Sequence, residues 1–267
     1  MLVFVYGGLG MAVKDIYLTC EEGTEALMPF VQEALNEIMD CFPEYKQYFP
    51  IKNLGNWKDN DYRSISNGSI CLEPYKSIQW YIERAKLKAK QQGRWQSRGQ
   101  ISIDQLYDDL SSDPFAKKIP QMSLLITKHD LYGTQSNGQL LNFCNGVTKE
   151  GNFAIISTAR FIDENNNFDI DRFNSVVMHE FGHLIGLTPD GRNNSYEQLG
   201  THCSNGDIME QDMSGTGIAM TRNRLERKRR GLPPICNDCI TAGKQFFARE
   251  VENYRARQSL LNNSLFR

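Results

Sequence analysis

The sequence has little net charge and lacks a long apolar run. Its 30 lysines and arginines nearly balance its 32 aspartates and glutamates, which leaves a formal charge of −2 at pH 7. No global field therefore attracts nucleic acid or an anionic membrane surface. No stretch of the sequence approaches the roughly 20 apolar residues that a membrane-spanning helix needs. We therefore expect neither a nucleic-acid partner nor a membrane partner.

The N-terminal run also lacks the features of a secretory signal. MLVFVYGGLGMAV is apolar, but no lysine or arginine precedes it and three glycines interrupt it, whereas a signal peptide has a positively charged first part. We interpret the run as a short strand, or as an extension upstream of a start at Met11. The seven cysteines are an odd number, so they cannot all pair within the chain. Without an export signal, we expect a cytoplasmic location, where thiols stay reduced.

Hydrophobic residues make up 40% of the 267-residue chain, which is enough to build a core. Periodicity predicts strands at 14–20, 121–128, 140–144 and 152–161, and helices at 24–41, 75–92 and 102–112. A further helix, capped by Asp171 or Asn174, is predicted to run to about Leu187. Beyond it the sequence is rich in loop residues, with helices predicted at 220–230 and 240–258. We therefore expect an α/β subdomain over residues 1–187, and an irregular, partly helical C-terminal subdomain over residues 188–267.

Histidine is scarce, yet two of the four histidines fall in one short motif. HEFGH, at residues 179–183, fits the pattern H-E-x-x-H. Residues i and i+4 lie about 40° apart around a helix, so His179 and His183 can face one metal ion. Glu180 then lies beside the metal, where it can act as the general base. The alternative is a buried helix that carries two incidental histidines.

A catalytic zinc needs three protein ligands and one open position. His129 and His202 are the other histidines. His202 is favoured because it follows in a polar loop, after a glycine that lets the chain turn back. Glu197 and Glu210 remain alternatives, since some zinc peptidases use a downstream carboxylate.

Four motifs together resemble archaemetzincins, a family of the metzincin clan. They are HEFGHLIGL, the HC pair at 202–203, an I-M dipeptide at 208–209 and CNDC at 236–239. LLITKHDLY and AIISTARF also resemble family sequence. The resemblance covers residues 121–247 and, more weakly, 14–45. It implies a metzincin-like mixed α/β fold, one catalytic zinc, and hydrolysis of a peptide or protein substrate.

The same resemblance implies further roles for individual residues. Met209 corresponds to the Met-turn residue that packs beneath the catalytic zinc. The strand at 153–160 corresponds to the edge strand that pairs with an extended substrate. In the family, four cysteines hold a second, structural zinc. The matching residues here are Cys203, Asp207, Cys236 and Cys239.

The sequence departs from the family pattern at two points. In the commonest metzincin spacing the third histidine lies six residues after the second, and here Pro189 occupies that position. His202 comes nineteen residues after His183. Asp207 stands where the family has a cysteine, and zinc also accepts carboxylate oxygen. The alternative for this second site is a vestigial cluster of free thiols.

Two other functions remain open at this point. The chain could be a catalytically silent, zinc-stabilised interaction module, although a purely structural site gains nothing from Glu180. It could also bind nucleic acid through the basic run at 221–230. Glu226 interrupts that run, and a solvated helix face is the simpler interpretation.

Overall fold

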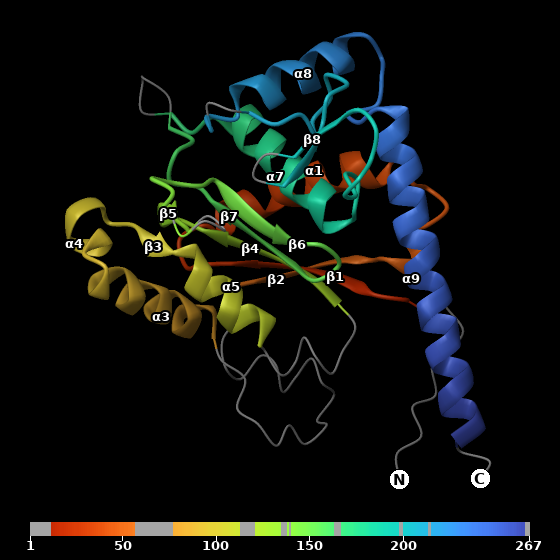
Figure 1. Ribbon diagram of the computed structural model, residues 1–267, viewed down its shortest axis with the longest axis horizontal. Helices are drawn as coiled ribbons and strands as arrows, with labels where there is room; N and C mark the ends of the chain where they lie inside the picture. The colour runs from red at the N-terminus through yellow and green to blue at the C-terminus, as the bar shows by residue number, and fades with distance from the viewer. Residues whose placement is uncertain are drawn as a thin grey trace.

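The computed structural model describes residues 12–56, 77–112, 121–134, 138, 140–162, 167–197, 200–212 and 215–264. A five-stranded sheet lies at its centre, in the order β2-β1-β4-β7-β6 (Figure 1). Its strands are β1 (Asp15–Cys20), β2 (Ile51–Gly55), β4 (Gln121–Thr127), β6 (Gly146–Lys149) and β7 (Phe153–Ser157). β1, β2, β4 and β7 run parallel, and β6 is antiparallel to β7 at the edge.

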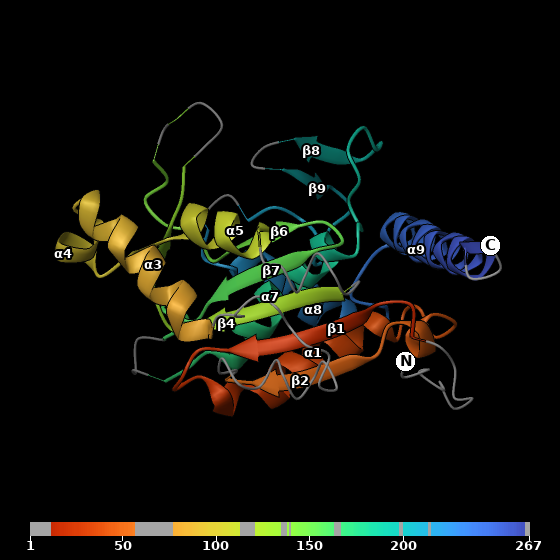
Figure 2. The same ribbon diagram turned by 90° about the horizontal axis from the view of Figure 1, so that it is seen from below.

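Helices cover both faces of this sheet (Figures 1 and 2). α1 (Met28–Met39) and α7 (Ile170–Leu184) lie on one face, and α3 (Ile78–Gln91) and α5 (Ile103–Ser111) lie on the other. Side chains along a strand alternate between faces, and β4 shows this clearly. Leu124 packs with the α1 and α7 side chains, and Leu125 packs with those of α3 and α5. The predicted mixed α/β fold is confirmed.

A capping residue and a buried apolar face fix the start and the orientation of α7, the helix that carries HEFGH. Asp169 caps its first turn by accepting a hydrogen bond from the Arg172 backbone N–H at 3.0 Å, so the predicted caps Asp171 and Asn174 are wrong by a few residues. Val177, Phe181 and Leu184 are fully buried against the sheet. Because one stripe of α7 is anchored in the core, the stripe that carries the histidines has a fixed direction.

Two strand predictions in this region need correction. LLNFC at 140–144 forms only isolated bridges, at Leu140 and Cys144, and the strand begins at Gly146 instead. The strand at 153–160 is not the edge of the sheet. β7 is fully buried between β4 and β6, so β6 is the edge strand. The antiparallel β6 hairpin lies between the predicted strand and solvent, which periodicity alone did not reveal.

The chain after Leu187 is irregular and partly helical, as predicted. It contains the hairpin β8 (Ser195–Glu197) and β9 (Thr201–Cys203), followed by α8 (Ile218–Arg229) and α9 (Asn237–Ser264). α9 runs beside the body of the molecule (Figure 1) and buries Phe247 against Phe42 and Phe49. Side chains from this part join the same hydrophobic core as α1 and α7. The division at residue 187 remains a prediction.

The remaining elements are short. They are η1 (Glu25–Leu27), η2 (Lys46–Tyr48), α4 (Arg94–Arg98), and the pair β3 (Ile101–Ser102) and β5 (Leu131–Tyr132). The N-terminal run at residues 1–11, for which a strand is predicted, lies outside the described residues.

Candidate metal centres

Three histidines from two elements meet at one point. α7 supplies His179 and His183, and β9 supplies His202. One ring nitrogen from each lies within 4.8 Å of the other two. The Nε2 atoms of His179 and His183 are 3.1 Å apart. Tetrahedral zinc with Zn–N bonds near 2.0–2.1 Å places its nitrogens about 3.3 Å apart, so this spacing fits a zinc ion.

The opposite nitrogen of each ring is hydrogen-bonded to an oxygen. Nδ1 of His179 lies 2.9 Å from the Ile208 carbonyl, and Nδ1 of His202 lies 2.9 Å from the Gly200 carbonyl. Nδ1 of His183 lies 3.1 Å from the Thr188 hydroxyl. A carbonyl can only accept, so in His179 and His202 Nδ1 carries the proton and Nε2 keeps its lone pair. Such outer partners fix the tautomer and the orientation of a metal-binding imidazole.

The surroundings of the cluster also favour neutral rings. Burial lowers the pKa of His179 to about 4, assisted by the nearby His202. Burial likewise lowers the pKa of His183 and that of His202. At neutral pH the three rings are therefore uncharged, which is the form that binds a metal ion.

Glu180 lies next to the cluster but outside the group that could hold a metal ion. Its Oε2 accepts a hydrogen bond of 2.6 Å from the Thr148 hydroxyl on β6. A Cβ on Gly146 would come within 2.8 Å of the Glu180 carboxyl group, so only glycine leaves room for it there. Burial raises the pKa of Glu180 to about 7, although the Thr148 hydrogen bond lowers it in part. A carboxylate with a pKa near 7 is suited to take and return a proton at neutral pH.

Met209 packs directly beneath the HEFGH turn. It is fully buried, and a Cβ on Gly182 would lie only 2.2 Å from its sulfur. The glycine in HEFGH therefore provides the space that Met209 fills. Met209 is also tied to β9, because its carbonyl accepts the Cys203 backbone N–H at 2.9 Å.

Two of the other candidate ligands, Glu210 and His129, take other positions. Glu210 accepts a hydrogen bond of 2.6 Å from Asn223 and is not in the histidine group. The Glu197 side chain lies outside the described residues. His129 lies at the end of β4, where its Nε2 is 3.0 Å from the buried Glu21 carboxylate. The structure thus brings His202, and not His129, to the HEFGH histidines.

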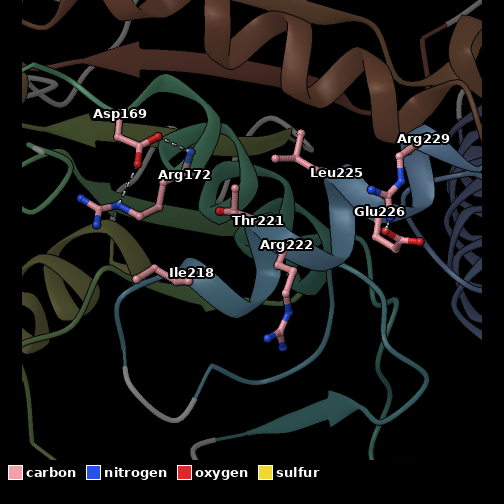
Figure 3. A pocket seen from close by; sticks show the side chains of 8 residues that line it. All are labelled: Asp169, Arg172, Ile218, Thr221, Arg222, Leu225, Glu226 and Arg229. Atoms are coloured by element: carbon pink, nitrogen blue, oxygen red, sulfur yellow. Dashed lines mark hydrogen bonds and ion pairs between the residues drawn. The ribbon is translucent and has the colours of Figure 1, made fainter.

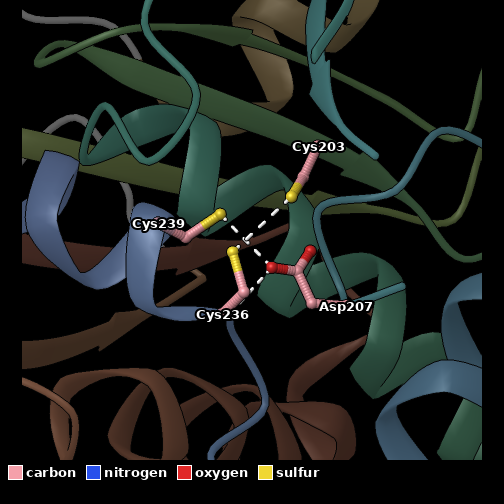
Figure 4. Close-up of side chains that lie close together, drawn as sticks. All are labelled: Cys203, Asp207, Cys236 and Cys239. Carbon is pink, nitrogen blue, oxygen red and sulfur yellow. Dashed lines mark hydrogen bonds between the residues drawn. The ribbon is translucent and has the colours of Figure 1, made fainter. Parts of the chain in front are cut away.

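Three cysteines and one aspartate form a second cluster (Figure 4). Cys203 comes from β9, Cys236 and Cys239 from the start of α9, and Asp207 from the intervening loop, and all four are buried. The Cys203 and Cys236 sulfurs are 3.7 Å apart, and the Cys239 sulfur is 3.3 Å from Oδ2 of Asp207. Tetrahedral zinc with Zn–S bonds of 2.3 Å and Zn–O bonds near 2.0 Å predicts about 3.8 and 3.5 Å for these separations. The donor set therefore fits zinc in composition and in spacing.

These four acidic groups cannot all ionise without a cation. Hydrogen bonds from Cys203 and Cys239 hold the pKa of the Cys236 thiol far below its usual value. The hydrogen bond with Cys236 raises the pKa of Cys203 to about 12, and those with Cys203 and Cys236 raise the pKa of Cys239 well above its usual range. Burial, followed by the Cys236 charge, raises the pKa of Asp207 to about 6. The opposite directions of these shifts show that the ionised groups disfavour one another at this distance, and a bound cation would offset that repulsion.

Three of the residues around these clusters were not predicted from the sequence. Thr148 and Gly146 hold Glu180, and Arg192 reaches the sulfurs of the second cluster. No motif marks them, because each acts through a contact across the fold.

Some basic residues of α8 make contacts within the fold, and others line a groove at the surface. Arg224 is buried against Glu37, at 2.7 Å, and Arg227 donates to the carbonyls of Pro233 and Ile235. Arg222 and Arg229 line a groove of about 530 Å³ between α8 and the start of α7 (Figure 3). Within that groove Arg229 pairs with Glu226. Two of the basic residues therefore stabilise the fold and are not free to bind a partner.

Among the described residues, no helix is long and apolar enough to cross a membrane.

No protein-family model matches the sequence, and no curated protein matches it. Similar structures do exist. The crystal structure of an archaemetzincin from Methanopyrus kandleri is 19% identical, with a TM-score of 0.49 over 90% of this chain and 96% of that one. That of an archaemetzincin from Archaeoglobus fulgidus, complexed with malonate, is 17% identical, with a TM-score of 0.48 over 85% of this chain and 99% of that one. Both belong to the family that the sequence motifs resemble.

Proposed function

We propose that this chain is a zinc-dependent peptidase in which His179, His183 and His202 hold the catalytic zinc. The observation that carries the proposal is the combination of two features at one place. Two buried imidazoles and one half-buried imidazole converge through one nitrogen each, and the partly buried carboxylate of the adjacent Glu180, with a pKa near 7, does not join them. A structural zinc site has no use for that carboxylate, whereas a hydrolytic site requires it.

Zinc bound there would polarise the substrate carbonyl and lower the pKa of a coordinated water from 15.7 to about 7. Glu180 takes a proton from the attacking water and later donates it to the leaving amine. The Thr148 hydroxyl holds the carboxylate in position by its hydrogen bond of 2.6 Å. Burial of Glu180 keeps the proton affinity of the carboxylate high enough for both transfers.

The edge strand β6 is the proposed site for the peptide backbone. It ends the sheet, so one side of its backbone is not paired within the sheet. An extended peptide can add to such an edge as a further strand. Gly146 and Thr148 of this strand contact Glu180. A peptide paired with β6 would therefore pass close to the base.

We further propose that Cys203, Asp207, Cys236 and Cys239 hold a second zinc with a structural role. Three thiols and one carboxylate fill all four tetrahedral positions, and a closed site of this kind has no position left for water or substrate. With both sites filled, the protein would carry two zinc ions per chain. The role of Met209 is packing beneath the first site.

The test is peptide cleavage measured together with metal content. The purified protein, loaded with zinc, is incubated with a mixed peptide library, and new termini are identified by mass spectrometry. We expect cleavage that stops when a chelator removes zinc and returns when zinc is added back. A silent interaction module would carry the same zinc and yield no new termini, and that result would overturn the proposed activity.

A further inference from the structure

Arg192 lies in the segment between His183 and His202, which is longer than the commonest metzincin spacing; we call this segment the insertion. Its Nη1 donates a hydrogen bond of 3.1 Å to the Cys239 sulfur, and its Nη2 donates one of 3.0 Å to the Cys203 sulfur. Nη2 also lies 3.7 Å from the Cys236 sulfur. One guanidinium group therefore contacts all three sulfurs of the second cluster.

The side chain and the backbone of Arg192 also connect the insertion to neighbouring elements. Nη1 donates to the Leu187 carbonyl at 2.9 Å, just beyond the end of α7. The Arg192 carbonyl accepts a hydrogen bond of 2.6 Å from the Ser195 hydroxyl, at the start of β8. Arg192 thus connects the end of α7, the β8–β9 hairpin and the start of α9.

The charge of the cluster explains why a cation is needed beside it. Three thiolates and one carboxylate carry four negative charges, so a divalent ion would leave a net charge of about −2 in a buried site. Uncompensated buried charge is costly. Arg192 supplies one positive charge in direct contact with the sulfurs. Asn205 adds neutral donors, from its backbone N–H to Cys203 and from its side chain to Cys236, both at 3.4 Å.

The position of β9 then links the two clusters. Successive side chains of a strand point to opposite faces, so His202 and Cys203 point to opposite sides of β9. One side supplies a member of the histidine cluster, and the other supplies a member of the sulfur cluster. Whatever fixes Cys203 therefore also fixes the strand that presents His202.

We propose that Arg192 is a positioning residue that clamps the insertion onto the sulfur–carboxylate cluster and thereby places His202. This inference rests on the proposed second zinc. It accounts for the long spacing between His183 and His202, because the extra residues carry the arginine that anchors them. The planar guanidinium is essential, since it reaches several sulfurs at once in a fixed geometry that the single ammonium group of lysine does not reproduce.

The experiment compares Arg192→Met, Arg192→Lys and the matched control Arg222→Met in the full chain loaded with Co²⁺. Only the second site offers sulfur, so a thiolate-to-cobalt charge-transfer band reports its occupancy. Chelator competition then gives the metal affinity of each site. Arg222 is exposed and lines the groove in Figure 3 rather than the sulfur cluster. Circular dichroism confirms that each variant is folded.

We expect Arg192→Met to weaken the second site by about 10- to 100-fold, as is typical when an outer partner of a metal ligand is lost. The first site should weaken by at least about fivefold, which is the low end of coupling between distinct sites. Arg192→Lys should recover less than half of the lost binding free energy at either site. Arg222→Met should bind metal as tightly as the parent at both sites.

Unchanged affinity of the second site in Arg192→Met would overturn the inference. If only the second site loses metal affinity, the claim that Arg192 places His202 is overturned. A parent protein without the charge-transfer band would overturn the inference but leave the histidine site and the proposed peptidase untouched. Absence of peptide cleavage with both sites filled would overturn the proposed activity alone.

Discussion

The two clusters on either side of β9 differ in what they require before a metal ion arrives. The three histidines are neutral, two of them buried and His183 half-buried, and their outer nitrogens are already hydrogen-bonded. The sulfur cluster consists of four acidic groups that compete for negative charge. The first is therefore preorganised for a metal ion, whereas the second needs a cation, protons or Arg192 to relieve its own repulsion. A preorganised site with a free base suits catalysis, and a site that a cation holds together suits a structural role.

The largest effect should follow from removing the base at the first cluster. Glu180→Gln keeps the shape of the side chain but cannot accept the proton from water. We expect kcat/KM for peptide cleavage to fall by about 100- to 10,000-fold, which is the usual contribution of general acid–base catalysis. The zinc content should stay unchanged at both clusters, because Glu180 is not part of either group. Turnover equal to that of the parent would show that Glu180 is not the base.

Removing His202 should weaken metal binding at the first cluster and leave metal binding at the second cluster unchanged. His202→Ala deletes a proposed ligand, so the affinity of the first site should fall by more than the roughly 10- to 100-fold that loss of an outer partner costs. The second site should keep its thiolate-to-cobalt band, since Cys203 stays in place. Chelator competition on cobalt-loaded protein measures both.

His129→Ala is the matched control for this variant. His129 lies 3.0 Å from the buried Glu21 carboxylate. Glu21 keeps its hydrogen bonds from Thr127 and Lys128, and the loss of one hydrogen bond costs about 1 kcal/mol. We therefore expect a lower melting temperature with unchanged affinity of the first site. If Glu210→Ala weakens the first site and His202→Ala does not, the assignment of the third ligand is wrong.

The pH dependence of metal binding should also differ between the clusters. The lowered histidine pKa values, about 4 for His179, mean that no proton has to leave the first site near neutral pH. At the second site the pKa values of Cys203 and Cys239 are raised, so both thiols must lose a proton when a metal ion binds. Affinity of the second site should therefore rise by about 100-fold per pH unit between pH 7 and 8, tenfold for each proton. Affinity of the first site should stay nearly constant over the same range, and equal slopes would contradict the difference in protonation.

The sequence predicted those parts of the molecule that depend on local pattern. The mixed α/β fold followed from periodicity, and the α7 histidines followed from the spacing of HEFGH. The resemblance, rather than any spacing rule, pointed to Cys203, Asp207, Cys236 and Cys239 as one group, and these four do lie together.

What the sequence missed depends on contacts between distant segments. The strand predicted at 140–144 lies at 146–149 instead. β7 was taken for the edge strand, because the hydrophobic pattern does not reveal which strand ends a sheet. Thr148 supports Glu180 from 32 residues away, and Arg192 reaches Cys239 across 47 residues. Neither contact leaves a local signature, since it exists only after the fold has brought the segments together.

The smallest effect should come from exchanging the carboxylate of the second cluster for a thiol. Asp207→Cys would complete a set of four sulfurs, and soft thiolate ligands favour zinc more than a carboxylate does. The exchange also has a cost, because Asp207 accepts hydrogen bonds of 2.8 Å from the backbone N–H groups of Met209 and Cys236. A single sulfur cannot replace both, and each lost bond costs about 1 kcal/mol. We therefore expect the second site to tighten by only about tenfold. The first site should change by less than about threefold, since Met209 remains held by its contact with Gly182 and by Cys203. Chelator competition at both sites measures the two factors. A weaker second site would mean that Asp207 serves mainly as a backbone acceptor and that the metal has three protein ligands.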